Sequence, residues 1–102
     1  MYQLRVYTIN NLKNAKIYLD VHWTRHIPSL KKYGITTCNV FRTDNKADEE
    51  QQVLALVKCD ADQDLNELNQ KYMASPEFKV DMQGFDMSAI KNVMTIDLVE
   101  KA

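Results

Sequence analysis

A short run near the middle of the chain constrains the fold more than any other feature. Residues 52–59, Gln-Val-Leu-Ala-Leu-Val-Lys-Cys, are apolar at almost every position. A strand that is apolar on both faces is typical of a central strand that is covered on each side. The chain is therefore expected to build a sheet around this strand.

Three other segments are also predicted to be strands. Residues 2–9 and 35–42 are rich in β-branched and aromatic side chains, and residues 90–99 alternate between two faces. The polar and charged residues 43–51 suit an exposed hairpin loop between two of the strands. In the first strand, Arg5, Tyr7 and Ile9 share one face.

A long helix is predicted from about Leu12 to Tyr33. The two asparagines at positions 10 and 11 can cap its start, and Gly34 follows its basic last turn. Pro28 lies inside this helix and removes one backbone hydrogen bond, so we expect a bend near Thr24.

The second helical region has two parts. Asp60 and Gln63 have the spacing of a capping box, which predicts a helix from there to about Ala74. Ser75 as N-cap and Pro76 at the first helical position then predict a second short helix.

The predicted order of elements is β-α-β-β-α-β over residues 1–102, read as a single domain. This order is the split-βαβ pattern of the α+β, ferredoxin-like fold, in which a four-stranded antiparallel sheet carries its helices on one face. The other face then has no cover although it must hold apolar side chains, which suggests a protein partner surface. We expect a homodimer that packs sheet against sheet.

Composition excludes several classes of function. Thirteen basic and fourteen acidic residues give a formal charge of −1, so there is no basic field for nucleic acid. No apolar stretch is long enough to span a membrane or act as a signal segment, which favours a cytoplasmic protein. Cys38 and Cys59 are far apart and lack metal-site spacing, so both are interpreted as reduced thiols. With only two glycines, the chain has no phosphate-binding glycine loop.

Two histidines on the first helix are the leading candidates for function. At 100° per residue from Ala15, His22 lies near ~340° and His26 near ~20°, in the middle of the apolar stripe. Both rings should therefore point to where the core lies. They are either hydrogen-bonded core residues or the polar lining of a cavity beneath the helix. A shared metal would need a third ligand, which this face does not offer, so no metal site is predicted.

Three short segments give the chain a family resemblance. The opening Tyr2-Gln3-Leu4-Arg5-Val6-Tyr7-Thr8, the run from His26-Ile27-Pro28 to Gly34, and Ser75-Pro76-Glu77-Phe78 occur in this order in the predicted elements. With that order of elements, they make the chain resemble the NIPSNAP family. The resemblance spans nearly the whole chain.

The resemblance implies a dimeric α+β barrel. That superfamily includes cofactor-free monooxygenases that act on polycyclic aromatics, haem-degrading enzymes, and stress-responsive members without assigned chemistry. Mitochondrial relatives carry a targeting extension, whereas this sequence begins at its first strand, as expected of a short bacterial-type member.

The leading hypothesis is a NIPSNAP-like homodimer that binds a small, partly apolar or aromatic molecule between the first helix and the sheet, without a cofactor. His26 is a polar contact in this hypothesis and the candidate general base in the enzyme alternative given below. The full set of candidate ligand-binding residues is His22, His26, Tyr7, Tyr33, Trp23, Arg25, Asn39 and Phe85. Two alternatives stay open: a cofactor-independent monooxygenase or isomerase that uses the same pocket, and a protein-interaction module without chemistry.

Overall fold

Four strands form one antiparallel sheet in the computed structural model, which describes residues 1–102. Their order across the sheet is β2-β3-β1-β4. The strands are β1 (Tyr2–Ile9), β2 (Thr36–Arg42), β3 (Gln51–Lys58) and β4 (Ile90–Leu98). The apolar run that was predicted to be a central strand is β3, and it lies between β2 and β1 as expected.

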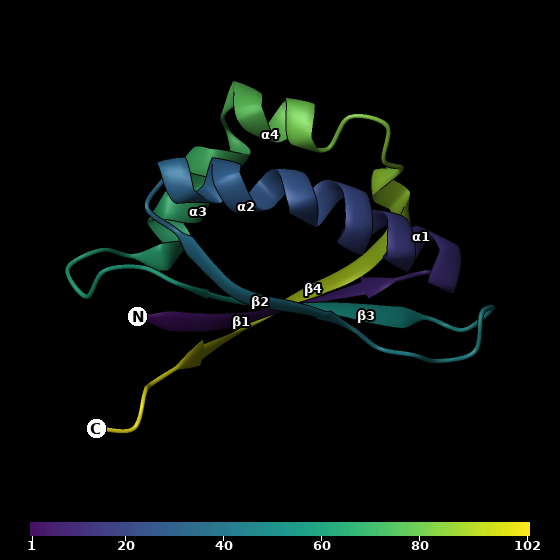
Figure 1. The fold of residues 1–102 in the computed structure, drawn as a ribbon, viewed down its shortest axis with the longest axis horizontal. Coiled ribbons are helices and arrows are strands. Elements are labelled where there is room, and N and C mark those ends of the chain that lie inside the picture. Colours follow the sequence, from purple (N-terminus) through teal and green to yellow (C-terminus); the bar gives the residue numbers. More distant parts are fainter.

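All the helices lie on one side of the sheet (Figure 1). They are α1 (Leu12–Ile17), the π-helical turn η1 (Tyr18–His22), α2 (Trp23–Lys32), α3 (Leu65–Met73), α4 (Pro76–Asp81) and the short 3₁₀ helix η2 (Met87–Ala89). This arrangement confirms the predicted α+β, ferredoxin-like fold. None of these helices is both long enough and apolar enough to cross a membrane.

The first helix is not one continuous α-helix. The N–H of Trp23 donates to the carbonyl oxygen of Tyr18, five residues before it, so the chain makes one wide π turn. This π turn ends just before Thr24, and the bend near Thr24 stays a prediction. The adjacent residues His22 and Trp23, where the turn ends, are both buried, at 2% exposure each.

The predicted cap of the second helical region is also wrong. The carboxylate of Asp64, not that of Asp60, accepts the N–H groups of Asn66 and Glu67 at the start of α3. Asp60 instead accepts the backbone N–H of Gln63 through its carbonyl oxygen in a turn before the helix. The caps of the other two predicted helices are confirmed, since Asn11 accepts the N–H of Asn14 and Ser75 that of Phe78.

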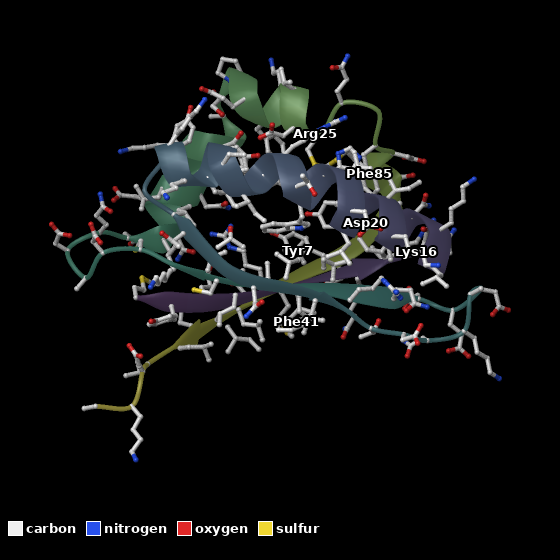
Figure 2. All side chains as sticks on the ribbon, viewed as in Figure 1. Tyr7, Lys16, Asp20, Arg25, Phe41 and Phe85 are labelled. Carbon is white, nitrogen blue, oxygen red and sulfur yellow. The ribbon has the colours of Figure 1, made fainter.

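The two faces of the sheet differ in what covers them. The register pairs Arg5 with Ala55 and Thr95, and these positions face the helices. The residues one position along face away from the helices, and on that open face apolar side chains predominate. They are Leu4, Val6, Phe41, Leu54, Leu56, Met94, Ile96 and Leu98. Figure 2 shows the contrast, with Tyr7 between the sheet and the helices and Phe41 on the opposite side.

Candidate functional site

A cavity of about 350 Å³ lies between the helices and the sheet. Eleven of its fifteen lining residues are hydrophobic. Its floor includes Arg5 and Tyr7 of β1, and its roof includes Trp23 and His26 of α2. The partly exposed side chains of Met73, Met87 and Val93 lie where α3, η2 and β4 meet the solvent. The cavity has the size and mostly apolar lining of a small-molecule site.

His26 is held in this cavity wall by a chain of hydrogen bonds. Its Nδ1 atom bonds to the hydroxyl of Tyr72, and that hydroxyl donates to Oδ2 of Asp81 over 2.6 Å. All three residues are buried. The segment that follows the N-cap Ser75 carries Asp81 at the end of α4, so the short Ser-Pro helix supplies the acceptor for this chain.

The hydrogen bonds fix which nitrogen of His26 carries the proton. Burial and the Asp81 carboxylate raise the pKa of Tyr72 well above its usual range, so Tyr72 is neutral and has one proton to donate. Because Asp81 accepts that proton, the Tyr72 oxygen must accept from Nδ1–H of His26. Nε2 of His26 is then an acceptor with no protein partner.

Burial also keeps His26 uncharged. Desolvation lowers the pKa of His26 to about 4, against the opposing effect of Asp81, and the positive charge of Arg5 adds to the lowering. The contact between His26 Nδ1 and Asp81 Oδ2, at 4.0 Å, is therefore not an ion pair at neutral pH. His26 presents a neutral imidazole to the cavity.

His22 is buried but does not line the cavity. Its Nδ1 atom lies 2.8 Å from the backbone oxygen of Asp81 and donates to it. Its ring packs edge-on against Phe85, with ring centres 4.9 Å apart. His22 therefore anchors the end of α4 to the π turn, which places the Asp81 carboxylate beside Tyr72.

Arg5 is a cavity residue that was not among the predicted site residues. It is only 3% exposed, its Nε donates to Gln3 Oε1 over 3.0 Å, and its Nη1 donates to Asn69 Oδ1 over 2.8 Å. Its Nη2 is buried without any acceptor. An arginine in a predicted strand gives no sign of burial by itself. Its position on the same face as Tyr7 and Ile9 was the only available signal.

An aromatic group lines the cavity beside Arg5. The ring of Tyr7 meets those of Tyr18 and Trp23 edge-on, with centres 5.3 and 6.0 Å apart. Burial raises the pKa of Tyr7, and it raises that of Tyr18 further, so both hydroxyls are neutral. The indole Nε1 of Trp23 is buried without an acceptor. Tyr7 and Trp23 thus lie at the cavity with His26, as the sequence reasoning expected.

The remaining predicted residues lie elsewhere. Tyr33 donates to Glu77 at the far end of α2, and Arg25 reaches the backbone oxygens of Asp81 and Gln83 on the outer side (Figure 2). Asn39 is exposed on the open face of β2. Phe85 packs against His22 and Tyr18 behind the cavity wall. No group of three or more His, Cys, Asp or Glu side chains could hold a metal ion.

Comparisons with known proteins show what the fold is similar to. No protein-family model matches the sequence, and no curated protein matches it significantly. An uncharacterised NIPSNAP domain protein from Burkholderia xenovorans has a similar structure, with a TM-score of 0.61 and 10% identity over 98% of this chain and 95% of that one.

Two further solved structures share the architecture. The Rv0793 protein of Mycobacterium tuberculosis has a TM-score of 0.55 and 8% identity, over 100% of this chain and 99% of that one. A Caulobacter crescentus protein with the provisional name antibiotic biosynthesis monooxygenase has a TM-score of 0.50 and 15% identity, over 97% and 91%. At these identities the similarity establishes a shared fold, and it confirms the NIPSNAP resemblance at that level alone.

Proposed function

We propose that this chain is a homodimeric domain that binds a small, partly apolar molecule in the cavity between its helices and its sheet. The observation that carries the proposal is the cavity itself: about 350 Å³ of mostly apolar space, into whose wall the fold brings His26, Trp23 and Arg5. Dry apolar walls with a few fixed polar groups are typical of sites that bind small organic molecules.

The open face of the sheet supports the dimer. Phe41 is 56% exposed, Met94 47% and Ile96 40%, and all three lie on the same face. Apolar side chains clustered on one face mark an interaction surface, and a second copy of the chain offers the same surface in return.

The chain contains its own reporter for ligand binding. Trp23 is its only tryptophan, and it lines the cavity. Its indole N–H therefore gives one isolated cross-peak in a ¹H–¹⁵N spectrum. We expect small aromatic alcohols and acids with naphthalene, indole or biphenyl bodies to include compounds that shift this peak saturably.

A pair of threonine variants controls the measurement. Thr95→Phe adds bulk at a residue that lines the cavity, whereas Thr24→Phe adds the same bulk on the exposed side of α2. Thr95→Phe should weaken binding and Thr24→Phe should not. If no compound of the panel shifts the Trp23 peak saturably, the cavity is not a binding site, and the interaction module that uses the open face becomes the better hypothesis.

A second candidate function is a cofactor-independent oxygenase or isomerase. The observation that favours it is the unpartnered Nε2 of His26, backed through Tyr72 by the carboxylate of Asp81. This arrangement lets His26 take a proton from an electron-rich phenol or quinol while Asp81 stabilises the imidazolium. With a pKa of about 4, His26 is a weak base, so the substrate anion would also need stabilisation.

Oxygen uptake tests this candidate. Turnover of a hydroquinone in air should depend on His26, and His26→Gln should abolish it while Lys16→Gln, at an exposed residue of α1, leaves it unchanged. Equal rates for the wild-type chain and His26→Gln would remove His26 from any catalytic role.

A further inference from the structure

Arg5 carries a buried positive charge that no acidic group neutralises. Both of its acceptors, Gln3 Oε1 and Asn69 Oδ1, are neutral amide oxygens. Arg5 takes part neither in the ion pair of Arg42 with Asp44 nor in the contact between His26 and Asp81. An arginine cannot shed its proton in a protein, so the charge must be compensated from outside the protein or stay uncompensated.

The rest of this guanidinium has no charged acceptor. Of its five N–H groups, one on Nε and one on Nη1 donate to these amides, and Nη2 is buried without a hydrogen-bond partner. The hydroxyl of Tyr7 lies close enough for Arg5 to lower the pKa of Tyr7, but this hydroxyl is neutral. A buried guanidinium that has no anionic partner and lines a cavity is complementary to a carboxylate.

The indole of Trp23 lines the same cavity, but its N–H is not a contact point for a ligand. Nε1 of Trp23 is buried, and the hydroxyl of Tyr18 lies close enough for Trp23 to affect the pKa of Tyr18. The uncompensated charge of Arg5 is therefore the feature of the wall that favours an anionic ligand.

The other titratable groups of the wall leave the cavity with one positive charge. Tyr7, Tyr18 and Tyr72 are neutral because burial raises their pKa values, and His26 is neutral because burial lowers its pKa to about 4. Two carboxylates lie one hydrogen-bonded residue behind the wall: Asp81 accepts from Tyr72, and Asp97 accepts from Gln3, which in turn accepts from Arg5. No anionic side chain lines the cavity.

We infer that the cavity takes a small apolar molecule that carries a carboxylate, and that this carboxylate balances the charge of Arg5 in the cavity wall. The inference rests on the proposed function, because it names the chemistry of the ligand for the same cavity. A carboxylate is chosen over a phenol because it is already ionised at neutral pH and needs no deprotonation to balance the charge.

Two probes of nearly equal shape test the inference. 2-Naphthoate carries the carboxylate, and 2-naphthalenemethanol replaces it by a neutral alcohol. Followed by the Trp23 indole peak at neutral pH, the wild-type chain should bind 2-naphthoate about tenfold or more tightly than the alcohol, since hydrogen bonds between charged groups are the stronger ones.

Substitutions of Arg5 test whether this residue causes the preference for 2-naphthoate. Arg5→Met should bring the two affinities to within about threefold of each other, while Arg5→Lys, which keeps the charge, should retain part of the preference for 2-naphthoate. Arg5→Lys also keeps the test informative if Arg5→Met does not fold.

The outcomes separate the inference from the proposed function. Equal affinities of the wild-type chain for both probes would overturn the inference that the ligand carries a carboxylate, and would leave the cavity as a site for neutral molecules. A preference that survives Arg5→Met would overturn the role of Arg5. If neither probe shifts the Trp23 peak, the proposed function fails for this class of ligand and the inference fails with it.

Discussion

At the scale of single residues, the contribution of the buried His26 to folding stability depends on the protonation state of its ring. Because burial lowers the pKa of His26 to about 4, the folded chain favours the neutral ring, whereas in the unfolded chain the ring has its ordinary pKa of about 6.5. Below about pH 6.5 the ring of His26 binds a proton in the unfolded chain but not in the folded chain. His26 therefore makes folding less favourable as pH falls from about 6.5 to about 4.

This difference predicts a pH dependence of stability. Between about pH 7 and about pH 4, the free energy of unfolding should fall by up to about 3 kcal/mol through His26 alone. Urea unfolding of the wild-type chain and of His26→Gln at both pH values measures the contribution of His26 to this fall, since the variant lacks the titrating ring. An equal fall for both chains would show that His26 is not the group responsible.

The tyrosine of the hydrogen-bonded chain gives a second prediction. Tyr72→Phe leaves the buried carboxylate of Asp81 and Nδ1 of His26 without their shared partner, so we expect a loss of about 2 kcal/mol in the free energy of unfolding. Tyr33→Phe is the matched control, because its hydroxyl bonds to the side chain of Glu77 near the surface. Its effect, measured by the same urea titration, should be much smaller.

The sequence predicts those features of the site that depend on residues close together in the chain, and not those that depend on contacts between distant elements. The burial of His26 could be predicted because helical periodicity is a local pattern and holds for this turn. Arg5 and Tyr72 could not, because their roles depend on contacts between β1, α2, α3 and α4. Asn69 lies sixty-four residues from Arg5, and Tyr72 forty-six from His26.

At the scale of elements, the π turn adjoins two neighbouring residues that are both buried in the helix–sheet layer. In a regular helix the adjacent residues His22 and Trp23 point about 100° apart, so burying both needs an apolar stripe at least that wide. In the structure both residues are buried, and they lie at the end of the wide turn from Tyr18 to His22. Sequence periodicity assumes one constant pitch, so it gave no sign of this turn.

The start of α3 provides a test at this scale. Asp64→Ala removes the acceptor of the first N–H groups of the helix and should lower the free energy of unfolding by about 1 kcal/mol. Asp60→Ala, at the position that the sequence pattern favoured as the cap, should have little effect because its side chain has no capping hydrogen bond. Chemical denaturation of both variants measures the difference, and a larger effect for Asp60→Ala would contradict the cap.

At the scale of the whole molecule, the order of elements was predictable and the state of assembly needs its own experiment. Each strand and helix has a distinct local pattern, and the handedness rules leave few ways to connect them, so the fold follows from the sequence. The cavity between the layers does not follow, because it depends on how side chains from seven elements fill the space.

The proposed dimer makes a direct prediction. Ile96→Lys puts a charge among the apolar side chains of the open face and should convert the dimer to a monomer at micromolar concentration. Val80→Lys, at a residue of α4 that is 62% exposed on the helical side, should leave the dimer intact. Sedimentation equilibrium distinguishes these outcomes, and a monomeric mass for the unsubstituted chain would exclude the dimer.

The alternation of side chains along β4 has a consequence for both proposals together. Val93 and Thr95 line the cavity, whereas Met94 and Ile96, their immediate neighbours, lie on the open face. β4 is an edge strand paired to β1 alone. One strand, which is hydrogen-bonded to a single neighbour, thus contributes to both surfaces. A molecule that binds in the cavity and reduces the motion of β4 should therefore also strengthen the association of two chains. By thermodynamic linkage, the apparent affinity for that molecule should then rise with protein concentration, which titrations at two concentrations can measure.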